Sequence, residues 1–146
     1  MGGWGKLWEV EDSARNLLID CRTKVEWYKA LGLLNIEKEP ELNAQDSIRF
    51  WGTVLKDHPG PLGRLFECEM HSAYDEYDDP NVSFLGCDEV NEVAQALNAL
   101  KKEYFMELFR KKDASWIREA WFYEPLRSFL SSASEKGKAV IIIWGN

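Results

Sequence analysis

Hydrophobic and polar residues form their clearest patterns near the two ends of the chain. Apolar side chains in 126–133 recur every three and four residues, a spacing that predicts an amphipathic helix. Gly137 then supplies a residue that tolerates the left-handed conformation common at helix ends. The segment 139–144 (AVIIIW) is an unbroken apolar run rich in β-branched residues. Such a run predicts a strand that is buried on both faces.

A second strand is predicted at the start of the chain. Residues 4–10 (WGKLWEV) alternate loosely, with Lys6 between apolar positions of one face. Two strands at opposite ends with helices between them predict an α+β fold. We expect a small mixed or antiparallel sheet that contains the N- and C-terminal strands and packs against several helices. The pattern leaves strand order and direction open.

The segments between these strands mostly have helical periodicity. Three helices are predicted in the first half of the chain: from Asp12 or Ser13 to about Asp20, from Thr23 through Leu31, and from Asp46 or Ser47 up to the turn at 58–61 (HPGP). Three further helical segments are predicted from Gly86 through Leu100, around 104–109, and over 116–133. Pro125 must kink the last of these or start a new helix there. Alternation predicts a strand within 62–70, a short extended piece at 82–85, and connections at 35–43 and 71–80.

Composition limits the classes of function. The chain has 146 residues, 45% of them hydrophobic, which fits one domain spanning 1–146 with a proper core. The net charge of -7 argues against nucleic-acid binding, which depends on basic side chains, and favours a basic partner. Because no apolar run approaches about 20 residues and the start does not resemble a signal peptide, we expect no membrane span or leader.

The cysteines indicate a reducing compartment. Cys21, Cys68 and Cys87 are odd in number and unpatterned in spacing, which fits free thiols better than a disulfide framework. We therefore expect a cytoplasmic protein. The oligomeric state stays open.

Metal and nucleophile motifs are weak. Cys68 and His71 have the spacing of half a zinc site, but a second ligand pair is missing, so a buried thiol beside an exposed histidine is the simpler interpretation. Cys87 opens a predicted helix, where a thiol pKa can fall, but no histidine is near in sequence. No pair of carboxylates is marked out for acid–base work. We assign no catalytic residue, no metal ligand and no cofactor.

The acidic tract at 74–79 is the strongest compositional feature. Its residues, as candidates for a binding surface, are Tyr74, Asp75, Glu76, Tyr77, Asp78 and Asp79. The ligand pattern of an EF-hand is absent. The tract predicts either a surface that docks on a basic partner or a solvated loop with no binding role.

Tryptophan is also abundant, with seven residues. Most should be core, and one or two left exposed would be interface anchors. Trp116 and Trp121 cannot share one face of a straight helix, so one of them is the better anchor candidate.

Three segments resemble the YfbM-like family of small bacterial proteins, a domain of unknown function. They are Ser83-Phe84-Leu85 followed by Asp88-Glu89-Val90 and Ala94-Gln95-Ala96-Leu97; Leu126-Arg127-Ser128-Phe129 running through Glu135-Lys136-Gly137-Lys138-Ala139-Val140; and Leu34-Asn35-Ile36-Glu37-Lys38 followed by Pro61-Leu62-Gly63. The resemblance implies a compact α+β domain of the bacterial cytoplasm and no catalytic residues. The chain departs from the family at Glu39-Pro40-Glu41-Leu42 and at Gly86-Cys87.

Two functional hypotheses follow. The first is a non-enzymatic protein-interaction domain, including an immunity-type protein that neutralises a toxin through its acidic surface. The rival is a small enzyme or ligand-binding domain with a pocket between the helices and the C-terminal strand, where His71, Tyr104 or Arg118 would converge. A homo-oligomeric structural protein is a third reading.

Overall fold

The structure is a computed structural model that describes residues 4–21, 24–34, 40–67, 70–71 and 81–145. Within these ranges the strands form one five-stranded sheet in the order β2-β1-β5-β4-β3, and every neighbouring pair is antiparallel. The strands are β1 (Trp4–Val10), β2 (Leu42–Asn43), β3 (Met70–His71), β4 (Asn81–Leu85) and β5 (Ala139–Gly145). The predicted α+β fold is confirmed.

The C-terminal strand β5 is the centre of this sheet. It pairs with β1 along the whole of both strands, from Trp4 opposite Gly145 to Val10 opposite Ala139. On its other edge it pairs with β4. Residues 139–143 are buried, as the unbroken apolar run predicted. The two ends of the chain therefore meet in neighbouring strands.

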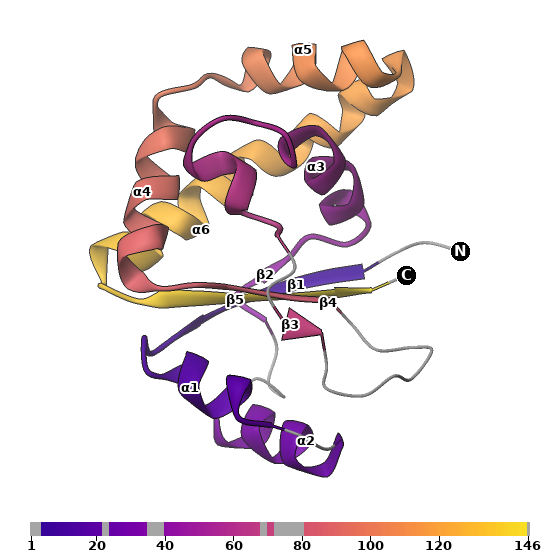
Figure 1. The fold of residues 1–146 in the computed structure, drawn as a ribbon. Coiled ribbons are helices and arrows are strands. Elements are labelled where there is room, and N and C mark those ends of the chain that lie inside the picture. The colour runs from indigo at the N-terminus through magenta and orange to yellow at the C-terminus, as the bar shows by residue number, and fades with distance from the viewer. Residues whose placement is uncertain (1–3, 22–23, 35–39, 68–69, 72–80, 146) are drawn as a thin grey trace.

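Helices cover both faces of the sheet (Figure 1). One face carries α1 (Ala14–Ile19) and α2 (Lys24–Leu33), and the other carries α3 (Ser47–Leu55), α4 (Cys87–Asn98) and α6 (Tyr123–Glu135), with α5 (Lys102–Lys112) packed on α3 and α6 away from the sheet. Two 3-10 helices, Pro61–Arg64 and Ala114–Phe122, lie in the connections. The result is three layers with the sheet in the middle.

Alternation along β5 divides the apolar interior into two cores, because successive strand residues point to opposite faces. Val140 and Ile142 belong to the larger core, under α3 to α6. Ile141 and Ile143 belong to the smaller core, under α1 and α2. A strand that serves two cores must be apolar at every position, which explains its composition.

Trp51 of α3 is the centre of the larger core. Its side chain is fully buried, and its ring lies 5.1 Å from that of Phe105 and 5.2 Å from that of Phe109, measured between centroids. The indole Nε1 donates a hydrogen bond to the backbone oxygen of Glu119 at 2.8 Å. The polar edge of this tryptophan is thus satisfied inside an otherwise aromatic cluster.

The strand predicted within 62–70 is wrong at its start, where Pro61–Arg64 is a 3-10 helix. Leu62 and Leu65 are both buried, and their three-residue spacing suits a helical turn rather than a strand. At its end, Met70 does belong to a strand, β3, and residues 68–69 lie outside the described residues. The connection predicted at 35–43 contains a short strand, because Leu42–Asn43 pairs with β1 as β2.

Other boundaries agree with the sequence. Pro125 lies in the first turn of α6, so the alternative of a new helix there is confirmed. Gly137, with a φ of 67°, takes the left-handed conformation expected after that helix. Within the described residues, no helix combines the length and apolarity required to cross a bilayer.

Candidate functional site

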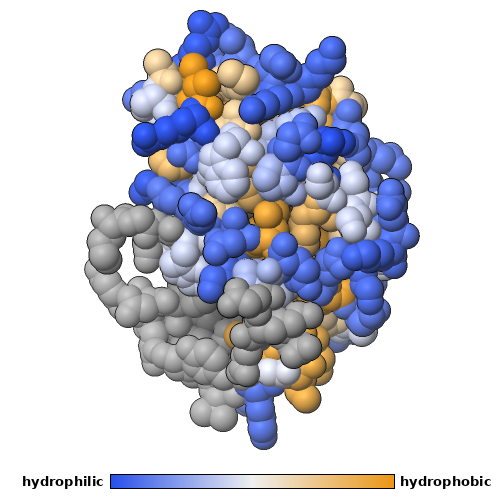
Figure 2. All heavy atoms as spheres, turned by 180° about the vertical axis from the view of Figure 1, so that it is seen from behind, coloured by the Kyte–Doolittle hydropathy of each residue, from blue (hydrophilic) through white to orange (hydrophobic). Residues whose placement is uncertain are grey.

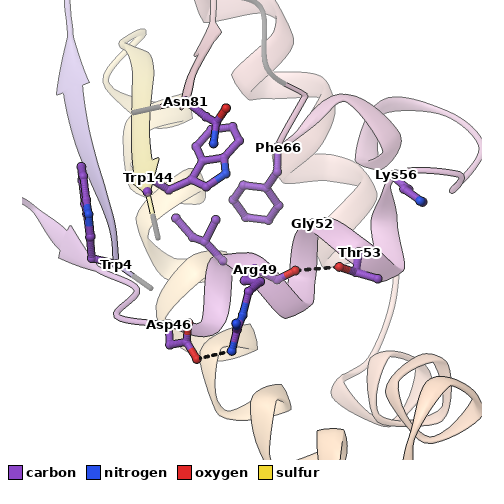
Figure 3. A pocket seen from close by; sticks show the side chains of 11 residues that line it. Trp4, Asp46, Arg49, Gly52, Thr53, Lys56, Phe66, Asn81 and Trp144 are labelled. Atoms are coloured by element: carbon purple, nitrogen blue, oxygen red, sulfur yellow. Dashed lines mark hydrogen bonds and ion pairs between the residues drawn. The ribbon is translucent and has the colours of Figure 1, made fainter. Parts of the chain in front are cut away.

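A pocket of about 310 Å³ opens beside α3, at the edge of the sheet where β1 begins and β5 ends. It is lined by residues from α3 and its N-terminal turn, from the connection after the first 3-10 helix, and from three strand ends. These residues are Trp4, Asp46, Ile48, Arg49, Gly52, Thr53, Lys56, Phe66, Asn81, Trp144 and Gly145. Figure 3 shows their arrangement.

Helix α3 supplies one wall because of its periodicity. Residues 49, 52, 53 and 56 line the pocket, and residues 48, 51 and 55 are buried. Each set follows the three- and four-residue spacing of one helix face, and the two faces are adjacent, so that the buried Ile48 also lines the pocket. Gly52 contributes no side chain, which leaves room in the middle of this wall.

The apolar part of the pocket is an aromatic pair. The rings of Phe66 and Trp144 meet edge to face, with centroids 6.5 Å apart and planes at 78°. Both side chains are half-buried. Trp4 stands apart from this pair in Figure 3. Neighbouring strand positions point to opposite faces, and Trp144 is paired with Gly5, so Trp4 projects from the other face of the sheet.

The charged groups at the rim are not equivalent. The Arg49 guanidinium lies 2.9 Å from the Asp46 carboxylate, and its carbon lies 4.9 Å from the ring centroid of Phe50. Lys56 is exposed and forms no ion pair with another described residue. The positive charge of Arg49 is therefore compensated locally, and that of Lys56 is not.

Two polar groups complete the lining. The Thr53 hydroxyl donates to the backbone oxygen of Arg49 at 2.9 Å, so its proton is engaged within α3. The side-chain amide of Asn81 lies near the Trp144 ring in Figure 3 and makes no hydrogen bond to another described residue. A second hollow of about 190 Å³ continues from Gly52, Lys56 and Phe66 toward Glu67.

The residues that line this pocket are of types that can bind a ligand. The described residues that line the pocket include no histidine or cysteine. They offer an aromatic surface, an amide and a cation, which are recognition groups.

The predicted acidic surface lies outside the described residues. This holds for Tyr74, Asp75, Glu76, Tyr77, Asp78 and Asp79. Of the suggested half metal site, Cys68 also lies outside them, and His71 is described only through its backbone in β3. Among the residues that are described, no three histidine, cysteine or acidic side chains come together as metal ligands.

Cys87 does open helix α4, but its thiol is not activated there. Its pKa is raised, first by burial and then by the nearby carboxylates of Asp12 and Asp88. The Asp12 carboxylate lies close to this thiol because it accepts a hydrogen bond from the Cys87 backbone nitrogen at 2.8 Å.

Two of the polar residues suggested for a pocket lie elsewhere, and the side chain of the third, His71, is outside the described part of the structure. Neither Tyr104 nor Arg118 lines the pocket beside α3. Tyr104 is hydrogen-bonded through its hydroxyl to Nε2 of His58 at 2.7 Å, and the side chain of Arg118 is 79% exposed. Of the two tryptophans considered as anchors, Trp121 is the more exposed, and Trp116 packs edge to face on Phe50.

Seen from behind in Figure 2, hydrophobic residues on this face appear as separate groups between hydrophilic ones. The aromatic residues of the pocket come from chain segments far apart in sequence.

The sequence pointed to Trp144 as part of the terminal strand but missed the rest of the site. Phe66, Asn81 and Lys56 belong to three separate segments and meet only through the packing of α3 on the sheet. The one available signal was the position of Trp144 at the end of an otherwise aliphatic strand, where the strand leaves the core.

Sheet order, helix placement and pocket together define an α+β protein with helices on both faces of an antiparallel sheet. No family model and no curated protein sequence matches the chain. Its structure is similar to that of YfbM from Escherichia coli, a protein of unknown function, with a TM-score of 0.64 over 97% of this chain and 99% of that one. The two chains are 14% identical, so the likeness concerns the fold. The resemblance expected from the sequence is confirmed at that level.

Proposed function

We propose that this chain is a non-enzymatic interaction domain that binds a partner protein. The supporting observation is the half-buried pair of Phe66 and Trp144 in a pocket with cationic residues at its rim. Aromatic residues and arginine are enriched at the centres of protein interfaces, where a few anchoring contacts carry most of the binding energy. The pocket is the place for one anchoring side chain of the partner.

The net charge of the whole chain sets the wider character of the partner. A net charge of -7 draws a basic protein and repels nucleic acid. Under this proposal the acidic tract at 74–79 adds a second contact, and the protein acts as an immunity-type protein in the bacterial cytoplasm. Among the described residues Cys21 and Cys87 form no disulfide with each other, which suits such a reducing compartment.

The experiment compares matched variants in an affinity capture from bacterial lysate. Wild-type protein, Trp144→Ala and Gly52→Leu are immobilised at equal density, and the retained proteins are quantified by mass spectrometry. Gly52→Leu places a side chain in the pocket wall from a helical position, which favours leucine over glycine. Trp121→Ala is the control, because this tryptophan is exposed but lies outside the pocket.

The expected result is one protein retained by wild type and by Trp121→Ala and lost from both pocket variants. Circular dichroism and thermal unfolding check that each variant is folded. Equal retention by Gly52→Leu and wild type contradicts the proposed role of the pocket. Retention unchanged after combined charge reversal of Asp75, Glu76, Asp78 and Asp79 removes the acidic tract from the interface.

A second candidate function is the binding of a small molecule in the same pocket. Its volume of about 310 Å³ falls at the lower end of the range typical of ligand sites, about 300–1,000 Å³. Native mass spectrometry of protein purified from its host tests this candidate. A co-purifying small molecule that is lost from Gly52→Leu supports it.

A further inference from the structure

The polar groups of the pocket allow its occupant to be specified, on the basis of the proposed function. We infer that the pocket takes an aromatic side chain of a partner peptide that has a backbone amide and a carboxylate beside the ring. Phe66 and Trp144 contact the ring, Asn81 the amide and Lys56 the carboxylate.

The aromatic pair selects a ring. Phe66 and Trp144 already meet edge to face at 6.5 Å, and both remain half-exposed toward the pocket. A third ring can extend this arrangement, because aromatic rings prefer edge-to-face and offset contacts. Ile48 adds an aliphatic surface to the same lining.

Asn81 favours a peptide over an apolar molecule without hydrogen-bonding groups. Its side-chain amide has a donor and an acceptor, neither of which bonds to another described residue. A peptide group has the complementary acceptor and donor. The closeness of Asn81 and Trp144 follows from the sheet, because they are paired across β4 and β5.

Lys56 favours a negative group. Asp46 compensates the charge of Arg49, but no acidic side chain among the described residues pairs with Lys56. The long, flexible lysine side chain at the rim can reach a carboxylate that lies above the aromatic pair. Glu67 lines the adjoining hollow together with Lys56.

A carboxylate at the pocket is compatible with a basic partner. The net charge of -7 attracts a basic protein at long range, while the two proteins approach each other. A single local charge instead fixes the orientation of the bound segment. A chain terminus or one acidic residue beside an aromatic residue meets this requirement on an otherwise basic surface.

Two probes that differ only in charge test the inference. N-acetyl-L-phenylalanine carries the ring, the amide and a free carboxylate, and N-acetyl-L-phenylalaninamide carries the same groups without the charge. Each is titrated into ¹⁵N-labelled protein, and binding is followed through the indole Nε1–H signal of Trp144, assigned with Trp144→Phe. N-acetylglycine is the control that lacks the ring.

The acid should bind about two- to fivefold more tightly than the amide, as expected for one solvent-exposed ion pair. Lys56→Gln should abolish this preference while retaining binding of the amide. Asn81→Ala should weaken both probes equally. Lys29→Gln, an exposed lysine of α2 on the other face of the sheet, should leave the preference unchanged.

Equal affinity for the two probes, or a preference that persists in Lys56→Gln, overturns the assignment of the carboxylate. Tight binding of N-acetylglycine overturns the role of the ring. If neither phenylalanine probe moves the Trp144 signal, the inferred occupant is wrong. Partner capture that still depends on Gly52 and Trp144 then leaves the proposed interaction function standing.

Discussion

Gly5 of β1 lies directly against the side chain of Ile48 in α3. A β-carbon at Gly5 would stand 2.7 Å from Cγ1 of Ile48, which is too close for any real contact. Ile48 is 2% exposed, and it is also one of the residues of α3 that line the pocket. The missing side chain at Gly5 therefore lets Ile48 of α3 pack closely on β1.

Gly5→Ala should destabilise the protein by about 1–3 kcal/mol, the usual cost of forcing a methyl group into a packed core. The side chain of Ile48 or the whole of α3 has to move. Urea unfolding followed by tryptophan fluorescence measures the change. Gly52→Ala is the matched control, because its β-carbon would lie 3.7 Å from that of Phe66, an ordinary contact.

The control substitution Gly52→Ala should change the stability of the protein in the opposite direction. Gly52 is inside α3, where alanine is favoured over glycine by up to about 1 kcal/mol. The same chemical change should therefore destabilise at Gly5 and stabilise at Gly52. Equal effects at the two positions would contradict the close packing of α3 on β1.

The carboxylate of Asp12 caps helix α4 from the other end of the sequence. It accepts a hydrogen bond from the Cys87 backbone nitrogen at 2.8 Å. Asp12→Ala should cost about 1 kcal/mol, as loss of a helix cap usually does. Asp12→Asn keeps the acceptor and should cost less. Thermal unfolding of wild type, Asp12→Asn and Asp12→Ala measures their order of stability. A more stable Asp12→Ala than Asp12→Asn would exclude the capping role.

The thiol of Cys87 provides a separate test of the same carboxylate. Burial, Asp12 and Asp88 raise the pKa of this thiol, in that order. Asp12→Asn should lower the pKa toward its ordinary value, because it removes one negative charge beside the thiolate. Alkylation of the Cys87 peptide is followed by mass spectrometry between pH 7 and 10. The variant should react faster at every pH below the pKa, and an unchanged profile would rule out Asp12 as a cause.

Replacement of Trp51 by phenylalanine should destabilise the protein, although the surroundings of Trp51 are aromatic. Trp51→Phe leaves the backbone oxygen of Glu119 without its donor and leaves a cavity beside Phe105 and Phe109. The loss of a buried partner costs about 1–3 kcal/mol before the cavity is counted. Trp121→Phe, at an exposed position, should change stability by no more than about 0.5 kcal/mol. Similar costs at both sites in chemical denaturation would contradict this account.

Asp113 should make stability depend on pH in the acid range. Its side chain accepts hydrogen bonds from the Ser115 backbone nitrogen at 2.9 Å and from the Ser115 hydroxyl at 2.8 Å, and both lower the pKa of the carboxyl group. The folded state therefore gains stability above the unfolded pKa of about 3.9 and loses it as the pH falls through the lower folded pKa.

Asp113→Asn keeps a capping side chain and removes the titration. Wild type should be the more stable protein near neutral pH, and the difference should shrink steadily as the pH falls below about 3.9. Urea unfolding at a series of pH values measures both proteins. A difference that stays constant with pH would show that the charge of Asp113 does not contribute.

The sequence predicted those elements that depend only on a pattern within a few neighbouring residues. The unbroken apolar run of 139–143 could only be a strand buried on both faces. Pro125 could only begin or bend a helix, and it begins α6. These outcomes follow from side-chain periodicity and backbone chemistry within a few residues, which the sequence contains directly.

Elements whose form depends on distant partners were not predictable in this way. Leu42–Asn43 is too short to have a pattern and is a strand only because Lys6 and Leu7 lie beside it. Leu62 and Leu65 sit in a helical turn because both must reach the core after the Pro61 turn. The alternation of apolar and acidic residues in 66–70 suggested a strand for this segment instead.

The sequence by itself determined the α+β class, the two terminal strands and most helices, because hydrophobic periodicity is a local property. Tertiary structure alone decided the strand order and the pocket. Phe66, Asn81 and Trp144 meet because β4 and β5 are neighbours and α3 rests on Gly5. Contacts between residues so far apart in the chain depend on how whole elements pack, and no short stretch of sequence specifies that packing.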